Sequence, residues 1–484
     1  MKDSNNTRFN AFSSILSDLR KEKRLSITEL GKKIGVSPRT VSKWENGLSL
    51  PSIDKLAELS QTLGVTVDTL LFDRPDKSPP LTKQDGMPSI TELYKTGSGP
   101  SSSHTIGPER AATAFKEKHP QADSFKVILY GSLAKTGKGH GTDNIIKKAF
   151  NPLPCKIEFD TVKEDIPHPN TMVLYAYNKG DELGRTRVFS VGGGAIQYED
   201  GEFPAPKVIY THQTFSDIAS YCEDNHLRLW EYVENVEGES IWEYLYGIWD
   251  TMKASIHAGL KDDGILPGGL EVRKKARHLY GLQHIDESAE TKENRLISAY
   301  AFAVGEQNAC GGRIVTAPTC GAAGVLPAVL YYQQKKHRFS DEVICRALAT
   351  GGLVGNLIKT NASISGAECG CQAEIGSACA MAAAAMAELF ELSIDKIEYA
   401  AEICIEHHLG LTCDPICGLV QIPCIERNAV AAMRAINAVN LSTFLSDTRK
   451  ISFDKVVLTM KETGEDLHHR YRETSEGGLA KLKV

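Results

Sequence analysis

The sequence predicts a multidomain protein in which an all-α domain is followed by an α+β domain and then by a larger all-α domain. Length is the first indication, because 484 residues correspond to about three domains of about 150 residues each. The second is the apolar pattern, which is helical over residues 12–71, strand-like in short runs over 88–212, and helical again from 214 onward. Hydrophobic residues make up 42% of the chain and charged residues 24%, so buried cores can form.

No membrane-spanning or exported segment is expected. The longest uncharged run of small residues, 375–387, falls short of the ~18 to 20 apolar residues that cross a bilayer. The first ten residues, MKDSNNTRFN, lack the apolar stretch and the small-residue cleavage site of a secretory signal. We therefore expect a cytoplasmic protein with no membrane contact.

The first domain is expected over residues 1–72 as four or five short helices, since short breaks separate groups of apolar residues at helical spacing. Ser37 can cap a helix that begins at Pro38 and runs to about Glu45. Residues 73–86 are rich in Pro, Lys and Asp and have no apolar period, so they are expected to form a linker.

Charge is divided unevenly between this first part and the rest. Residues 1–77 hold 13 Lys and Arg against 10 Asp and Glu, whereas the remainder holds 42 against 51. The acidic remainder offers no reason to bind nucleic acid, while the small basic part could do so.

The first domain resembles the helix-turn-helix domains of the Cro/repressor family over ITELGKKIGVSPRTVSKWENGLSLPSIDKLAELSQTLGV. In that family the second helix of the pair enters the DNA major groove. The resemblance implies that Val41 and Trp44 face inward and that four residues face DNA, namely Pro38, Arg39, Thr40 and Lys43. Such domains also serve as dimerisation modules, so two readings stay open: DNA binding and dimerisation alone. A homodimer is expected in either case.

The second domain is expected over residues 87–212. Its β-rich runs predict strands over 126–130, 155–159, 172–177, 187–191 and 207–210. Helical patterns over 107–118 and 144–150 lie between some of these strands, which predicts an α+β domain.

Two polar loops stand out in this domain. The first, GSGPSSSHTIGP at 97–108, places glycines, hydroxyls and a histidine ahead of a helix, where backbone N–H groups can hold a carboxylate or phosphate. The second, TGKGHGTD at 136–143, lacks the spacing of a nucleotide-binding loop. From the residues alone, each loop could equally be an ordinary turn.

The third domain, residues 213–484, is expected to contain helices without strands, with small residues on most faces over 377–388 and 429–439. Ten of the twelve cysteines lie between Cys310 and Cys424. In a reducing compartment such cysteines are metal ligands, reactive thiols or small buried side chains. Their spacings match no zinc or iron–sulfur pattern, so the residues alone favour buried thiols.

Several segments together resemble the iron–sulfur-dependent L-serine dehydratases. Those similar to the β domain of these enzymes are GPSSSHTIGPERAA, YGSLAKTGKGHGTD and FSVGGGAI. Those similar to the α domain are LPGGLEVRKKA, RIVTAPTCGAAGVLPAVL, ISGAECGCQAEIGSACAMAAA, EHHLGLTCDPICGLVQIPCIERNA and KETGEDLHHRYRETSEGGLA. The resemblance covers about 400 residues and the segments follow the order expected in that family.

The resemblance implies an L-serine ammonia-lyase that forms pyruvate and ammonia with a 4Fe-4S cluster. Its cluster ligands would be Cys371, Cys413 and Cys424, which leaves one iron open as a Lewis acid for the departing hydroxyl group. His140 is the expected general base, and Lys138 could assist it. The residues expected to bind the substrate are Ser101, Ser102, Ser103, His104 and Thr105.

Some positions depart from the family. Some members end in a cysteine that caps the open iron, whereas Ala480–Val484 contains none, so no such capping is expected. Extra thiols occur at Cys320, Cys369 and Cys417; one could approach the iron, but buried structural roles are favoured. His407 and His408, near Cys413, could support the cluster or be structural. An alternative function is a transcription regulator that senses serine or cluster state on a dehydratase body.

Overall fold

The computed structural model describes residues 12–13, 15–17, 19–21, 23, 25–65, 67, 70, 86–163, 166–199, 206–282, 286–445, 449–473 and 477–482. The chain forms two compact units, residues 1–82 and residues 83–484. No described helix combines the length and the apolar character that a bilayer crossing requires.

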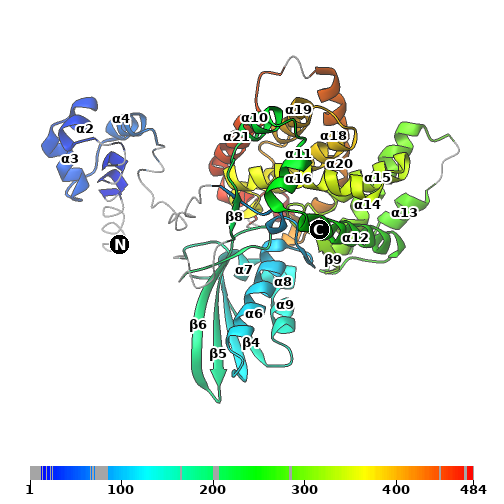
Figure 1. The fold of residues 1–484 in the computed structure, drawn as a ribbon. Helices are drawn as coiled ribbons and strands as arrows, with labels where there is room; N and C mark the ends of the chain where they lie inside the picture. Colours follow the sequence, from blue (N-terminus) through cyan, green and yellow to red (C-terminus); the bar gives the residue numbers. More distant parts are fainter. Residues whose placement is uncertain are drawn as a thin grey trace. The chain divides into compact units, whose positions relative to one another are not determined.

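The first unit contains the helices α2 (Ile27–Lys33), α3 (Pro38–Glu45) and α4 (Ile53–Leu63) (Figure 1). The expected start of α3 is confirmed, because the Ser37 side chain accepts a hydrogen bond from the backbone N–H of Thr40. Val41 and Trp44 are buried in the core of this unit, also as expected. Arg39 and Lys43, one helical turn apart, lie on the exposed face of α3.

The second unit holds a five-stranded sheet of order β4-β3-β5-β6-β7, in which β3 and β4 are parallel and the other neighbours antiparallel. Burial alternates along β3 because every second side chain faces the core. The strands of this unit are β1 (Met87–Pro88), β2 (Thr96–Ser98), β3 (Ser124–Tyr130), β4 (Cys155–Asp160), β5 (Thr171–Asn178), β6 (Asp181–Ser190), β7 (Ile196–Tyr198), β8 (Val208–Tyr210) and β9 (Arg313–Val315).

Helices α6 (Gly107–Lys118) and α9 (Thr142–Phe150) pack on this sheet, where Phe115 and Phe150 join its apolar core (Figure 1). The predicted helix over 107–118 is confirmed. Two shorter helices, α7 (Gly131–Lys135) and α8 (Gly137–His140), connect β3 to α9. The sheet therefore serves as the scaffold for the segments that carry the two polar loops.

The larger part of the second unit is helical, as predicted. At its centre lies α18, whose residues are all buried and which packs against α15, α16, α19 and α20. Small residues permit the close packing of α16 on α18. A Cβ atom added to Gly351 in α16 would lie 2.9 Å from the carbonyl oxygen of Met381 in α18. Its helices are α10 (Phe215–Asp224), α11 (Leu229–Glu237), α12 (Ser240–Lys261), α13 (Ala276–Gly281), α14 (Ala289–Ala309), α15 (Val325–His337), α16 (Asp341–Asn361), α17 (Gly366–Cys369), α18 (Ser377–Leu389), α19 (Ile394–Glu406), α20 (Cys424–Leu445) and α21 (Phe453–Asp466).

The expectation that residues 213–484 contain no strand is wrong, because β9 pairs with β2. The strand is too short to show an apolar alternation, and it forms because β2 supplies its hydrogen-bonding partner. Nearby, Tyr94 is fully buried among the helices, and its hydroxyl donates to the carbonyl oxygen of Leu348 at 2.9 Å. The segment around β1 and β2 thus shares the core of the helical region.

Candidate active site

Two buried histidines from the sheet region lie against each other. The rings of His104 and His140 stack with centroids 4.4 Å apart, and both side chains are almost fully buried. His104 comes from the serine-rich segment and His140 from the end of α8, so the fold brings the two predicted polar segments together.

The hydrogen bonds of His140 define its free nitrogen. Its Nδ1 lies 3.0 Å from the carbonyl oxygen of Thr136, which can only accept, so Nδ1 carries the proton. The other nitrogen, Nε2, is buried and has no hydrogen-bond partner among the described residues. Burial lowers the pKa of His140 to about 4, so the ring is neutral near pH 7. His140 therefore offers an unprotonated nitrogen inside the protein.

His104 takes the opposite tautomer. The Thr136 hydroxyl donates to the carbonyl oxygen of Ser132, so its oxygen can accept from His104 Nε2 at 2.8 Å. Nδ1 of His104 then has a lone pair, which lies 3.3 Å from the Ser101 hydroxyl. Burial, followed by the neighbouring His140, lowers the pKa of His104 well below its usual value. The pair is thus neutral as a whole.

The serine-rich segment is a helical turn where the sequence predicted a loop. Ser102–Ile106 form a single π-helical turn that continues directly into α6, and the Ser101 side chain accepts from the backbone N–H of His104. Gly107 allows the junction, since an added Cβ atom would lie 2.3 Å from the Ser190 hydroxyl. Because the first N–H groups of a helix lack intrahelical partners, Ser102 and Ser103 lie where an anion can bind.

The structure brings together Cys371, Cys413 and Cys424, which the resemblance implies as ligands. All three are buried: Cys371 precedes a π-helical turn (Gln372–Gly376), Cys413 lies in a loop, and Cys424 begins α20. The three thiols lie close enough to act on one another, since Cys371 and Cys413 are hydrogen-bonded and the charge of Cys371 raises the pKa of Cys424.

The surroundings of the thiols are charged and closely packed. A hydrogen bond from Cys413 lowers the pKa of Cys371, and Arg427 acts in the same direction. The thiol of Cys413 lies 3.9 Å from a carboxylate oxygen of Glu374, whose pKa is raised by burial. Gly366 leaves the necessary room, because an added Cβ atom would lie 3.0 Å from the sulfur of Cys413.

Glu473 lies between the three buried cysteines and the histidine pair. Its backbone N–H donates to the carbonyl oxygen of Cys413 at 2.8 Å, and its carboxylate lies 3.8 Å from Nδ1 of His104. One ligand atom from each of His104, His140 and Glu473 lies within 4.8 Å of the others. Burial raises the pKa of Glu473 to about 8, with contributions from Glu374 and Cys371. The thiols and the histidines therefore belong to one site.

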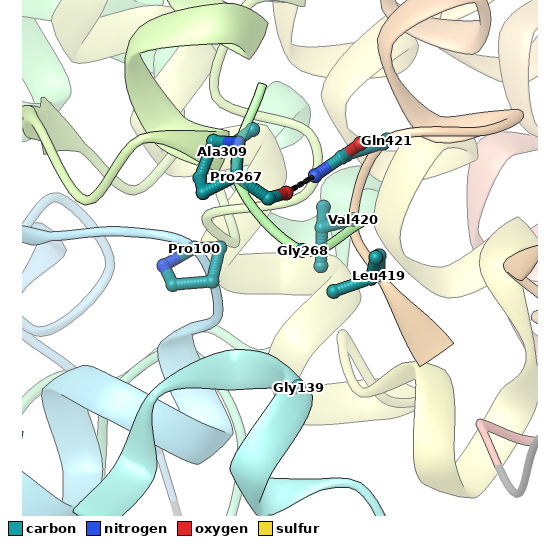
Figure 2. Close-up of a pocket in the computed structure, with 8 residues that line it drawn as sticks. All are labelled: Pro100, Gly139, Pro267, Gly268, Ala309, Leu419, Val420 and Gln421. Atoms are coloured by element: carbon teal, nitrogen blue, oxygen red, sulfur yellow. Dashed lines mark hydrogen bonds between the residues drawn. The ribbon is translucent and has the colours of Figure 1, made fainter. Parts of the chain in front are cut away.

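A pocket opens beside this site, between the sheet region and the helical region (Figure 2). Pro100 and Gly139, which line it, directly precede Ser101 and His140 in the chain. On the opposite side, Gln421 donates a hydrogen bond of 2.5 Å to the carbonyl oxygen of Pro267, which ties together two loops of the helical region (Figure 2). The lining residues are Pro100, Gly139, Pro267, Gly268, Ala309, Leu419, Val420 and Gln421.

Two predicted site residues, Thr105 and Lys138, make contacts other than those expected of them. The hydroxyl of Thr105 donates to the backbone carbonyl oxygens of Ser98 and Ser101, so it stabilises the turn. The ammonium group of Lys138 is exposed and lies 5.3 Å from the centre of the Phe159 ring. Among the described residues it makes no hydrogen bond or ion pair with either histidine.

The three extra thiols have different surroundings. Cys320 is buried, and burial followed by the charge of Glu374 raises its pKa. Cys369 is packed so tightly against α21 that a Cβ atom added to Gly464 would lie 2.5 Å from its sulfur. Cys417 is exposed, with a positive φ of 54°.

The adjacent histidines near Cys413 bond to the backbone of their own helix. Nδ1 of His407 lies 3.0 Å from the carbonyl oxygen of Ile403, and Nδ1 of His408 lies 2.6 Å from that of Cys404. His408 is buried, whereas the His407 side chain is more than half exposed.

Sequence reasoning missed Thr136, Glu374, Arg427 and Glu473. All four stand inside segments that carried the family resemblance: Glu374 three residues after Cys371, Arg427 three residues after Cys424, Glu473 in RYRETSEGG, and Thr136 at the start of TGKGHGTD. For Glu374 and Arg427, the available signal was the short distance in sequence to a predicted cysteine ligand. Nothing in the sequence placed Glu473 beside His104.

Comparison with known proteins agrees with this arrangement. Residues 123–480 match the family model of the serine dehydratase alpha chain, residues 89–151 that of the serine dehydratase beta chain, and residues 16–70 a helix-turn-helix model. The alpha-chain match begins well before residue 213, where the sequence analysis placed the start of the third domain.

Several relatives are similar over most of their length. The L-serine dehydratase of Haemophilus influenzae is 39% identical over 449 residues, covering 81% of this chain and 99% of that protein. The L-serine dehydratase of Streptomyces coelicolor is 40% identical, with 81% and 98% covered. L-serine dehydratase 1 of Escherichia coli is 39% identical, with 82% and 99% covered. The chain therefore belongs to the serine dehydratase family.

Proposed function

We propose that this chain is an L-serine ammonia-lyase, which converts L-serine to pyruvate and ammonia. One observation carries the proposal: Nε2 of His140, which has no hydrogen-bond partner among the described residues, and three buried thiols share a site, joined through His104 and Glu473. Such a site can combine proton removal with activation of a leaving group. The names of the relatives, L-serine dehydratases, support L-serine as the substrate.

A 4Fe-4S cluster is the cofactor that fits the thiols best. Cysteine thiolates are the usual ligands of such clusters, and Cys371, Cys413 and Cys424 are buried and lie close together. We therefore assign these three residues as its ligands. When bound through three thiolates, the cluster supplies a Lewis-acidic iron for the hydroxyl group of the substrate.

In the proposed reaction His140 acts as the general base. Its Nε2 takes the proton from the α-carbon of serine, and the electrons of that C–H bond form a double bond to C3. The C3–O bond breaks with its electron pair on oxygen, and the proton on His140 completes the water that leaves. The aminoacrylate product then tautomerises and hydrolyses to pyruvate and ammonia.

The start of the serine-rich helical turn is the proposed binding site for the substrate carboxylate. Backbone N–H groups and hydroxyls of Ser101, Ser102 and Ser103 lie at a helix N-terminus, which favours an anion. His104, which is held by Thr136 and Ser101, borders the same position. The carboxylate would therefore orient the α-carbon toward His140.

Anaerobic reconstitution tests the proposal. Protein loaded with iron and sulfide should release pyruvate and ammonia from L-serine in equal amounts. Protein that carries a full complement of iron and sulfide but releases neither product from L-serine would refute the enzymatic function and favour the sensing alternative.

The first unit supports a second function, DNA binding. Residues 16–70 match a helix-turn-helix model, and Arg39 and Lys43 occupy the exposed face of α3, opposite the buried Val41 and Trp44. We propose that Pro38, Arg39, Thr40 and Lys43 face the major groove. Titration of labelled DNA with the full chain at several salt concentrations tests this proposal.

A further inference from the structure

Glu473 is held in an unusual backbone conformation at the centre of the site. Its φ of 58° lies in the left-handed region, which residues with a side chain rarely adopt. Two hydrogen bonds keep the segment there: Cys413 N–H donates to the carbonyl oxygen of Tyr471, and Glu473 N–H donates to that of Cys413, each at 2.8 Å. The fold therefore enforces the position of this one side chain.

The carboxyl group of Glu473 has no compensating hydrogen-bond donor in the described part of the chain. No hydrogen bond to either of its oxygens occurs among the described residues, although its side chain is only 13% exposed. The nearest ring nitrogen, Nδ1 of His104 at 3.8 Å, carries a lone pair in the tautomer set by Thr136. The groups that act on it through their charge, Glu374 and Cys371, are themselves acids. A cationic group placed beside this buried carboxyl group would favour its ionised form and pair with it, so the surroundings suit a cation.

The substrate supplies such a group. The proposed function already assigns the carboxylate of serine to the serine-rich turn, its α-proton to His140 and its hydroxyl to the cluster. The α-ammonium group is the remaining handle, and an acidic side chain is its usual partner. Glu473 lies between the thiols and the histidine pair, so its carboxylate is within reach of a substrate bound to both.

We propose that Glu473 binds the α-ammonium group of the substrate and thereby selects amino acids over carboxylic acids that lack an amino group. This inference rests on the proposed function for the orientation of the substrate. It makes Glu473 a substrate-binding and specificity-determining residue.

Two ligands that cannot be dehydrated isolate this interaction. L-Alanine and propanoate both lack the hydroxyl group and differ from each other only in the ammonium group. Their dissociation constants for the anaerobically reconstituted protein can be measured by calorimetry, without turnover. Wild-type protein should bind L-alanine at least tenfold more tightly than propanoate. Glu473→Gln should remove that preference by weakening L-alanine binding about tenfold, with propanoate binding changed less than twofold.

Two further variants control for structural effects. Glu462→Gln removes a carboxylate from the exposed side of α21 and should leave both dissociation constants unchanged. Glu473→Asp keeps the charge on a shorter side chain and should retain part of the preference. If Glu473→Gln fails to retain its iron, the comparison is made with Glu473→Asp, which should still bind L-alanine less tightly than wild type with propanoate unaffected.

The inference is overturned if L-alanine and propanoate weaken equally in the Glu473 variants, or if neither changes. Failure of the proposed function would give a different result, namely no release of pyruvate from L-serine. The preference for L-alanine over propanoate, and its dependence on Glu473, can still be measured in such protein.

Discussion

Nδ1 of His140 lies 3.0 Å from the carbonyl oxygen of Thr136, and this contact leaves Nε2 of the buried ring unprotonated and without a hydrogen-bond partner among the residues that the structure describes. The arrangement resembles the way in which metal-binding and catalytic histidines are oriented through their second nitrogen. The site therefore contains a base, His140, that burial keeps in its neutral form.

The first prediction concerns pH. Because burial lowers the pKa of His140 to about 4 from an ordinary value of 6.5, its neutral form should persist as the pH falls below 6.5. We expect kcat for L-serine, which reports the enzyme–substrate complex, to decline on the acid side with a midpoint well below 6.5, in rates measured anaerobically at saturating L-serine while iron content is monitored. A midpoint at or above 6.5, with iron retained, would contradict this assignment.

The second prediction concerns the thiols. Cys413→Ser should lower bound iron to near zero and abolish turnover, because the remaining two thiols cannot hold the cluster. Cys345→Ser, which alters another buried thiol in α16, should retain iron and activity. Iron analysis and visible absorption distinguish these outcomes. Full iron content in the Cys413→Ser protein would remove Cys413 from the ligand set.

The third prediction concerns DNA. The double substitution Arg39→Ala and Lys43→Ala should weaken binding of the full chain to DNA and reduce the salt dependence of log K by about 2, since about two phosphate contacts are lost. Removing Arg277 and Lys292, which lie on the exposed surface of the second unit, should have no effect. Fluorescence anisotropy measures both. Undetectable binding by the wild-type chain at low salt would leave dimerisation as the role of the first unit.

The fourth prediction concerns stability. Burial, together with Lys95, lowers the pKa of Lys359 to about 7 from 10.5, so the folded state binds this proton less strongly than the unfolded state. Its unfavourable contribution is largest below pH 7 and disappears as the pH rises toward 10.5. Lys359→Met should therefore raise the free energy of unfolding at pH 7 by roughly 1–3 kcal/mol, and the gain should shrink at higher pH.

Denaturant midpoints of the second unit measure this gain, with Lys292→Met on the exposed side of α14 as the matched control. A gain that stays constant from pH 7 to pH 10 would contradict the linkage to the proton on Lys359.

Local patterns predicted the long elements well. Ser37 and Pro38 marked the start of α3, and the β-rich run over 126–130 marked the strand β3, because each signal lies within the element itself. The strand expected over 187–191 begins earlier, at Asp181, because pairing with β5 extends it through polar residues that show no alternation. Strand β9 was missed for a related reason, since its partner β2 is remote in sequence.

The site was predicted in part. Family motifs indicated His140 and Cys413, but the left-handed turn that places Glu473 between them depends on a backbone pairing between two distant segments. The serine-rich segment was expected to be a loop because its residues favour turns. It is helical because it continues into α6, with Gly107 packed against Ser190.

The most direct test of the catalytic account compares His140→Gln with wild type, both loaded anaerobically with iron and sulfide. His119→Gln is the matched control, because Nδ1 of His119 makes the same type of contact, 3.0 Å from the carbonyl oxygen of Phe115, outside the site. We predict that kcat for pyruvate formation falls by about 10²- to 10⁴-fold in His140→Gln with iron content unchanged, while the His119 variant stays within about twofold of wild type. Wild-type kcat in fully loaded His140→Gln protein would contradict the account.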